Sequence, residues 1–485
     1  MKLDNIGKDK VDKTKYDFTN DQQEAIDGII DFIAKPFNPA KYIVGLTGAG
    51  GTGKTFITNY IINNCVYSNS VIKCTSTTHK ACRVFSQAIG FRTVETIQSV
   101  LGLRLDLKLE DFNPDNPQFN PMGSPKLEYI KLLIVDESSM LPAKLVNYIR
   151  KICKDNSIKI LFIGDNYQLA PPNENKSIAF DICYKVYNLE EIVRQKLNNP
   201  IIDLISLLRK DIKNKTNEFI NYIATHVGTN NYNEVGEGFT ICNKETFNSL
   251  INMSFNDVEY TKNIDMYRII AYTNAKVAYW NNYVRNRIIK DSDKGIINKN
   301  DLVMSYDTIV DDFMNVIIAN SEEYIINDIV DFVDDKYGLK GFLVKFQMVH
   351  GGNITKPIFI IDHNEKYNIL KYHKIIEELI NDAKRANGGT RVSKWKKYYD
   401  FKKKYLIATN VLDTRGNIIH SRNIDYGFAL TSHKSQGSTY GVVFVDANDM
   451  IFNKNNIVYS DYEDMLRRLY VGCSRASNSL IICYG

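Results

Sequence analysis

The sequence predicts an α/β protein with parallel sheets, and three observations support this fold class. A short apolar run at residues 42–47 leads into the turn G-A-G-G-T-G-K-T at residues 48–55, and a helical pattern follows at residues 56–62. A second apolar run at residues 132–135 ends in two adjacent carboxylates. A second α/β region is indicated by residues 268–290 and by the predicted strands at 426–431, 442–445 and 480–483.

The glycine-rich turn is predicted to hold phosphate. Small residues such as Gly48, Gly51 and Gly53 let backbone N–H groups converge on phosphate oxygens, and the helix that begins next adds the positive end of its dipole. Lys54 is expected to reach the β- and γ-phosphates, and Thr55 to ligate Mg²⁺. The alternative is a chance glycine-rich connection, which the strand before it and the helix after it disfavour.

Size, charge and cysteine content limit the class of protein. The 485 residues, 44% of them hydrophobic, predict two to four globular domains. The net charge of +5 is mild, so any nucleic-acid surface must be local. The eight cysteines have no C-x-x-C or zinc-like spacing, which predicts reduced thiols, no disulfide and no structural metal. The sequence has neither an apolar signal region nor eighteen consecutive uncharged apolar residues, so we expect a protein that is neither secreted nor membrane-spanning.

A helix is expected to open near residue 18, with Thr19 or Asn20 as its N-cap and Gln22 in its first turn. The Gln22 amide both donates and accepts, so it could read the N6 and N7 edge of adenine, although a glutamine on a surface is more often solvated.

Two strand ends in the first half carry residues suited to a nucleic-acid backbone. A predicted strand at residues 71–80 ends in hydroxyl residues, among them Thr78, followed by His79 and Lys80. Ligands bind at the carboxyl ends of strands in open α/β sheets, so these side chains could hold phosphates. The alternative is a helix cap with solvated side chains. Thr96, in residues 93–99, leaves the same two alternatives open.

Residues 102–128 are predicted to form a protruding β-hairpin. Leucines alternate with polar residues from 103 to 109, and N-P-D-N-P at residues 113–117 is a turn signal. A stiff hairpin carrying Phe112 and Phe119 could act as a wedge at a duplex end, or could be surface decoration.

The acidic pair and the residues after the next strand complete a candidate hydrolytic site. Asp136 can hold the Mg²⁺ shell and Glu137 can polarise an attacking water, with a helix cap as the alternative. Gln168 follows the strand at residues 158–163 and could sense the γ-phosphate. Arg194 and Arg475 follow strand and helix patterns further along the chain, where an isolated arginine is usually a surface residue.

Residues 299–375 contain short β-rich runs separated by Gly and Asn, which suggests a small β-barrel insert. A predicted helical stretch at residues 374–405 interleaves Lys and Arg with aromatic residues, including Lys394, Trp395 and Lys396. This pattern suits phosphate attraction with base stacking, and a solvated basic helix is the equal alternative.

The ordered set of motifs resembles superfamily 1 helicases over nearly the whole chain. The match is closest to the type B branch of RecD-like and phage Dda-like helicases. Its elements are Gln22, residues 48–55, residues 77–79, Asp136 with Glu137, G-D-x-x-Q at 164–168, Arg194, T-S-H-K-S-Q-G at 431–437 and Y-V-G-C-S-R at 470–475. Val193 departs from the Tyr that some relatives place there against adenine, so base selectivity is expected to be weak.

The resemblance implies a role for each matched residue. Gln22 would contact adenine, and Gly437 would lie with the nucleotide-binding residues. Lys54, Thr55, Asp136 and Glu137 keep the roles given above, and Gln168 would sense the γ-phosphate. Arg194 and Arg475 would be the arginine fingers that stabilise transition-state charge when a cleft closes. The single strand would be held by Thr78, His79, Thr431, His433 and Ser435.

The implied fold has two RecA-like P-loop NTPase motor domains. Residues 1–185 form the first, with the hairpin at about 102–128 as a pin. Residues 186–290 with 421–485 form the second, and residues 291–420 form an inserted SH3-like β-barrel with the basic helical extension.

The implied function is ATP-driven, Mg²⁺-dependent 5′ to 3′ translocation on single-stranded DNA with duplex unwinding. The alternatives are an RNA or RNA–DNA helicase and an ATP-regulated loader or scaffold without unwinding. The expected protein is a monomer in the cytoplasm, that of the host if a phage encodes it. It would act on single-strand/duplex junctions, with single-strand-binding, replication or recombination proteins as candidate partners.

Overall fold

The computed structural model describes residues 17–90, 92–103, 123–171, 174–191, 199–290, 292–293, 295–311 and 315–485. Phe112 and Phe119 of the predicted pin, and Arg194, lie outside the described residues. The chain divides into two compact units. The first comprises Met1–Cys242, Ser435–Thr439 and Met450–Gly485, and the second comprises Asn243–Lys434 and Tyr440–Asp449. The predicted domain boundaries stay a prediction.

The first unit contains a six-stranded parallel sheet of order β3-β2-β4-β5-β1-β6. Its strands are β1 (Ile43–Gly48), β2 (Ile72–Ser76), β3 (Val94–Thr96), β4 (Leu132–Val135), β5 (Lys159–Gly164) and β6 (Lys185–Leu189). The predicted strand–turn–helix at the glycine-rich turn is confirmed, since β1 leads through it into α2 (Lys54–Asn64).

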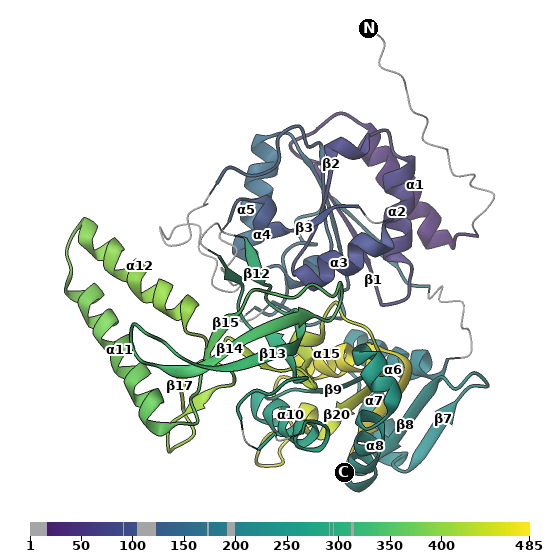
Figure 1. The fold of residues 1–485 in the computed structure, drawn as a ribbon. Coiled ribbons are helices and arrows are strands. Elements are labelled where there is room, and N and C mark those ends of the chain that lie inside the picture. Colours follow the sequence, from purple (N-terminus) through teal and green to yellow (C-terminus); the bar gives the residue numbers. More distant parts are fainter. Residues whose placement is uncertain are drawn as a thin grey trace. The chain divides into compact units, whose positions relative to one another are not determined.

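Helices cover both faces of this sheet (Figure 1). They are α1 (Asn20–Ala34), α2, α3 (His79–Ala88), α4 (Ile97–Val100) and α5 (Ala143–Asp155). Side chains alternate along a strand, so Val44 of β1 packs in one core with Ile26 of α1, while Ile43 packs in the other with Val146 of α5. Burial on both faces explains why β4 is purely apolar and why β1 and β5 are mostly so.

The remaining elements of the first unit come from two separate stretches of the chain, residues 200–242 and 462–483. They are α6 (Pro200–Asn214), α7 (Glu218–Thr225), β7 (Thr229–Tyr232), β8 (Gly238–Cys242), α15 (Tyr462–Cys473) and β21 (Ala476–Cys483). Strand β8 pairs in parallel with β21 and antiparallel with β7. Helix α15 packs against α6, and the Tyr462 hydroxyl donates to the Thr216 carbonyl at 2.9 Å.

The second unit contains further parallel strands and an antiparallel sheet. Strand β9 (Tyr267–Ala271) pairs in parallel with β19 (Ala429–Thr431) and β20 (Tyr440–Asp446). The neighbouring helices are α8 (Lys244–Phe255), α9 (Val258–Lys262), α10 (Asn274–Ile288), α13 (Ser432–Ser435) and α14 (Ala447–Ile451). The prediction of two parallel α/β regions is therefore confirmed.

The predicted β-rich insert is an antiparallel sheet of order β15-β14-β13-β10-β18. Its strands are β10 (Leu302–Ser305), β13 (Glu323–Val333), β14 (Lys340–Met348), β15 (Ile358–Ile361) and β18 (Ile424–Tyr426). Two small hairpins accompany it, β11 (Ile309–Val310) with β12 (Val316–Ile318) and β16 (Val411–Leu412) with β17 (Ile418–His420). The antiparallel insert is confirmed, and its closure into an SH3-like barrel stays a prediction.

The predicted helical stretch at residues 374–405 consists of two helices, α11 (Lys366–Arg385) and α12 (Gly389–Lys404). The break falls before two adjacent glycines, where Gly388 has a φ of 57° that favours glycine. The two helices lie side by side as a hairpin (Figure 1). In the part of the chain that the structure describes, no helix has the length and apolar character needed to cross a membrane.

Candidate nucleotide-binding site

The turn between β1 and α2 requires glycine at several positions. Gly51 and Gly53 have φ values of 89° and 87°, in the left-handed region where side chains are strained. A Cβ on Gly53 would lie 2.8 Å from Nε2 of Gln22, and one on Gly48 would lie 2.6 Å from the Thr52 hydroxyl. The loop therefore stays narrow, with α2 beginning at Lys54, as a phosphate cradle needs.

The Lys54 ammonium lies across this loop. Its Nζ donates to the carbonyl oxygens of Gly48 at 2.6 Å and Ala49 at 3.0 Å. Thr55 follows in the first turn of α2 and is half-buried. One cation and one hydroxyl thus stand at the positive end of a helix dipole, which is the donor set that a nucleotide phosphate with its Mg²⁺ requires.

Gln22 is buried and joins α1 to the loop. Thr19, one of the two predicted N-caps, caps α1, and its backbone N–H donates to Gln22 Oε1 at 3.2 Å. The other end of the amide, Nε2, donates to the Thr52 carbonyl at 3.1 Å. The side chain is 2% exposed, so the solvated alternative does not apply. One end of the amide holds the N-cap of α1 and the other holds the loop, and contact with adenine would require an exchange of one of these bonds.

Two carboxyl groups follow β4 at the same edge of the sheet. Glu137 has a φ of 54°, a strained value for a non-glycine residue. Burial, and then the neighbouring Glu137 charge, raises the pKa of Asp136 to about 7. Burial also raises the pKa of Glu137, while the charges of Arg475 and Lys54 oppose the rise. Crowded carboxylates with raised pKa values fit a divalent cation, which Asp136 and Thr55 would hold.

A pair of buried amides lies beyond β5. Gln168 Oε1 accepts from Nε2 of Gln436 at 3.2 Å, and the two side chains are 7% and 8% exposed. Arg467 of α15 also donates to the backbone carbonyl of Gln168 at 2.9 Å and to that of Asn166. The predicted γ-phosphate sensor is thus bonded through both its side chain and its backbone.

Tyr470 of α15 links the loop after β5 to the phosphate loop. Its hydroxyl donates to Asp165 Oδ2 at 2.7 Å and accepts from the Gly50 N–H at 3.4 Å. Burial, and then the Asp165 charge, raises the pKa of Tyr470, so the phenol keeps the proton it donates. Asp165 is itself 1% exposed and accepts from the Tyr167 N–H at 2.9 Å.

Arg475 and Gly437 complete the site within the first unit. Arg475 donates to the carbonyls of Val471 at 3.1 Å and Ser438 at 3.2 Å, and it is 8% exposed. Gly437 has a φ of 71°, and a Cβ built on it would lie 3.8 Å from Glu137 Oε1. The first unit therefore brings together Gln22, Gly48, Gly51, Gly53, Lys54, Thr55, Asp136, Glu137, Gln168, Gly437 and Arg475.

Comparison with known proteins agrees with this geometry. Residues 20–226 match the family model described as an AAA domain, and residues 426–483 match that of the UvrD-like helicase C-terminal domain. The ATP-dependent DNA helicase Dda of Enterobacteria phage T4 is 28% identical over 300 residues, which cover 59% of this chain and 61% of the phage protein. The chain belongs to the superfamily 1 helicases. Within them its motifs and its phage relative are those of the RecD- and Dda-like type, and it is an ATP-dependent DNA helicase.

Two further similarities extend over almost the whole chain. Protein R530 of Acanthamoeba polyphaga mimivirus is 23% identical over 514 residues, 96% of this chain and 99% of the viral protein. A solved structure titled for DNA unwinding at forked duplex DNA by two coordinating Pif1 helicases has a TM-score of 0.51 at 15% identity. It covers 97% of this chain and 92% of that chain, and so supports a common fold.

Several residues expected to grip DNA in this helicase also have local structural roles. The Thr78 hydroxyl accepts from the Ala81 N–H at 3.1 Å and caps α3, and the Thr96 hydroxyl accepts from the Ser99 N–H at 3.3 Å and caps α4. These are the helix caps that the sequence left as an alternative. His79 is half-buried and Lys80 is 6% exposed.

A second segment that is predicted to grip DNA, at residues 431–435, begins at the end of β19. Thr431 accepts from the Lys434 N–H at 3.2 Å, and His433 is half-buried. Ser435, which the division places in the first unit, is fully buried. None of these observations tests contact with a nucleic acid, so these assignments stay predictions.

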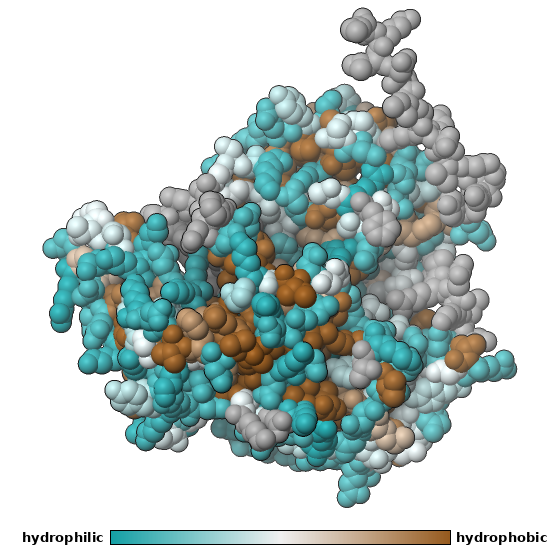
Figure 2. All heavy atoms as spheres, in the orientation of Figure 1, coloured by the Kyte–Doolittle hydropathy of each residue, from teal (hydrophilic) through white to brown (hydrophobic). Residues whose placement is uncertain are grey.

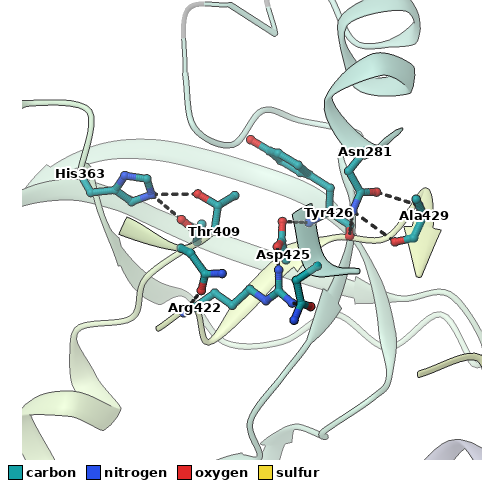
Figure 3. A network of polar contacts seen from close by, with 10 residues as sticks. Asn281, His363, Thr409, Arg422, Asp425, Tyr426 and Ala429 are labelled. Carbon is teal, nitrogen blue, oxygen red and sulfur yellow. Dashed lines mark hydrogen bonds and ion pairs between the residues drawn. The ribbon is translucent and has the colours of Figure 1, made fainter. Parts of the chain in front are cut away.

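A polar network in the second unit fixes the strands that lead to Thr431 (Figure 3). Asn281 of α10 donates to the carbonyls of Tyr426 at 2.9 Å and Ala429 at 3.2 Å, and it accepts from the Ala429 N–H at 2.7 Å. Nearby, Arg422 pairs with Asp425 and donates to Asn274 at 2.8 Å. The buried Asn281 amide takes the place of backbone hydrogen-bond partners, and so holds the junction between β18 and β19 rigid.

Sequence reasoning gave no role to Gln436, Arg467 or Tyr470. Gln436 and Tyr470 belong to motifs that were recognised, but their partners are about 270 and 305 residues away along the chain. The available signal was the spacing of Arg467 and Tyr470, because residues three apart on a helix share a face.

Replacing Tyr470 by phenylalanine is expected to lower kcat for ATP hydrolysis about tenfold with little change in KM, because small misplacements of catalytic loops cost up to ~10²-fold. The ring would still fill its buried site, but Asp165 and the Gly50 N–H would lose a partner. The matched control is Tyr462→Phe on the same helix, which removes a hydroxyl bonded at 2.9 Å to Thr216. Steady-state ATPase assays on both variants, with thermal unfolding, would measure this. An equal fall of kcat in the two variants would mean that lost stability causes the fall, and not the loss of the Asp165 and Gly50 bonds.

Proposed function

We propose that this helicase translocates 5′ to 3′ on single-stranded DNA and unwinds duplex DNA, driven by Mg²⁺-dependent ATP hydrolysis. The observation that carries the proposal is the assembly of phosphate loop, acidic pair, Gln168 and Arg475 around one site. The 5′ to 3′ direction is supported by the resemblance to the type B branch. The T4 relative named as an ATP-dependent DNA helicase supports DNA as the substrate.

The residues around the phosphate loop would divide the chemistry. Lys54 would neutralise charge on the β- and γ-phosphates, and the N-terminus of α2 would hold phosphate oxygens. Thr55 and Asp136 would hold Mg²⁺, which when bound supplies charge neutralisation at the phosphates. Glu137 would orient the attacking water and accept its proton, since the Arg475 and Lys54 charges favour the ionised form of its carboxyl.

Hydrolysis would be coupled to movement through groups that contact the γ-phosphate. Gln168 would sense that phosphate, and its bond to Gln436 would carry the signal toward the segment at residues 431–437. Arg475 would stabilise transition-state charge, with Arg194 as the second finger. Nucleotide identity would be read by Gln22, with weak selectivity because Val193 offers no aromatic face.

Alternating grip on the single strand would convert these changes into steps. Thr78, His79, Lys80 and Thr96 would hold it in the first motor domain. Thr431, His433 and Ser435 would hold it in the second, and the pin with Phe112 and Phe119 would split the duplex. Lys394, Trp395 and Lys396 of α12 would add nucleic-acid contacts. We propose a monomeric motor acting at single-strand/duplex junctions in a cytosol-like compartment, which the eight free thiols support.

Strand displacement on two substrates tests the direction of movement. One substrate carries a 5′ single-stranded tail and the other a 3′ tail, each with ATP and Mg²⁺. We expect displacement only from the 5′-tailed substrate, because the polarity follows the type B branch. Preference for the 3′ tail would contradict the assignment. Single-strand-stimulated hydrolysis without displacement of either would favour a loader, and displacement only from RNA-containing duplexes would favour an RNA helicase.

A further inference from the structure

Helix α12 concentrates the positive charge of the protein. Its 16 residues hold seven basic side chains and one acidic side chain, Asp400. That is a surplus of six positive charges, whereas the whole chain has a net charge of +5. The rest of the chain therefore has no excess of positive charge. The basic side chains are Arg391, Lys394, Lys396, Lys397, Lys402, Lys403 and Lys404.

The helix is held firmly on the second unit by its one buried residue. Phe401 is 4% exposed, and its ring centroid lies 5.4 Å from that of Tyr372 in α11 and 4.6 Å from that of Tyr405. These rings belong to a core that also includes Phe359 of β15. The basic side chains are therefore presented from a rigid helix about 24 Å long at 1.5 Å per residue. Hydrophilic residues predominate on the visible surface there (Figure 2).

Three of these cations are available to a partner. Lys394 pairs with Asp382 at 2.8 Å, and Lys404 lies 3.5 Å from Asp334. Arg391, Lys396 and Lys397 are exposed, and their side chains make no ion pair or hydrogen bond with any residue that the structure describes. Three cations without a salt bridge to a described residue thus lie within seven residues of α12, although Lys397 is near enough to Asp382 to lower the pKa of that carboxyl. They form a strongly positive surface in a protein of mild net charge.

Neighbouring aromatic side chains in the middle of α12 pack against one another, and of these only Tyr399 is exposed. The Trp395 ring centroid lies 5.6 Å from that of Tyr398 and 6.1 Å from that of Tyr399. Trp395 and Tyr398 are only partly exposed, and Tyr399 is 43% exposed. Base stacking requires an open aromatic face. The surface therefore offers charge for phosphates and little area for unpaired bases.

We propose that α12 binds the phosphate backbone of duplex DNA, without regard to sequence, and so holds the duplex part of a forked substrate. Duplex DNA presents one charge per ~1.7 Å, twice the density of one strand, and hides its bases from stacking. Both properties match a helix with free cations and packed aromatic rings. The inference deepens the proposed DNA helicase function and rests on it.

The test compares two double variants that remove the same charge. Arg391→Gln with Lys397→Gln removes two exposed cations of α12, and Lys374→Gln with Lys384→Gln removes two exposed cations of α11. Fluorescence anisotropy gives the affinity for a blunt duplex and for a single strand of equal length, each over a range of salt concentrations. Thermal unfolding confirms that both variants are folded.

We expect the α12 variant to bind the blunt duplex about tenfold more weakly, with a salt slope smaller by about two, because each phosphate contact contributes ~0.9 to that slope. The α11 variant should lose less than about threefold, and single-strand affinity should change little in either. Equal losses in the two variants, no loss in either, or an equal loss for the single strand would overturn the proposal. Single-strand-stimulated ATP hydrolysis, measured in parallel, tests the helicase function separately.

Discussion

Replacement of Lys54 by alanine is expected to reduce DNA-stimulated ATP hydrolysis by at least about 10²–10³-fold, the cost of removing one preorganised charge-stabilising donor. The ammonium lies within 3.0 Å of two carbonyls of the phosphate loop, where the β- and γ-phosphates are expected. Folding should be little affected, since Lys54 is only half-buried and water can replace its ammonium at the two loop carbonyls. A steady-state ATPase assay with saturating single-stranded DNA measures the effect.

The matched control for this variant is Lys151→Ala, which removes an exposed lysine of α5 from the same unit. It should hydrolyse ATP at the wild-type rate. If Lys54→Ala retained more than about a tenth of wild-type turnover while remaining folded, the phosphate role of Lys54 would be wrong.

Replacement of Glu137 by glutamine is expected to lower hydrolysis about 10²–10⁴-fold while nucleotide binding is retained, because general-base catalysis contributes that much. Glutamine keeps the length of the side chain but cannot accept the proton of the attacking water. The change also removes a neighbouring charge that raises the pKa of Asp136, so Asp136 would ionise more readily and its affinity for Mg²⁺ should not fall. Nucleotide binding is measured by isothermal titration, and turnover by single-turnover hydrolysis.

Glu128→Gln provides the control, since Glu128 is an exposed carboxylate in the same unit. A loss of nucleotide binding equal to the loss of turnover in Glu137→Gln would argue that Glu137 holds the metal instead of acting on water.

Local sequence patterns predicted the parts of the fold that depend on near neighbours. The phosphate loop was predictable because its glycines, Lys54 and Thr55 lie within eight consecutive residues, between a buried strand and a helix. The strand before Asp136 was predictable because burial on both faces leaves a purely apolar run. Thr19 was predictable as a cap because capping depends on residues three apart.

Contacts between distant segments could not be predicted in this way. The Gln22 amide bonds to Thr19 and to Thr52, and no residue near position 22 in the sequence predicts the bond to Thr52. The hydroxyl of Tyr470 meets Asp165 because tertiary packing brings α15 to the loop after β5. Lys394 and Lys396 look alike in sequence, yet only Lys394 has an acidic partner on the neighbouring helix. Long-range pairs of this kind depend on the whole fold.

Hydrolysis at the site in the first unit is proposed to drive duplex unwinding, and strand displacement from a 5′-tailed fork by the Glu137→Gln variant measures this coupling. The wild-type protein is assayed beside it at equal fractional DNA occupancy. We expect the variant to bind ATP and the fork but to displace no strand within the time that the wild-type protein completes the reaction. Displacement by the variant at the wild-type rate would show that unwinding does not depend on hydrolysis at this site.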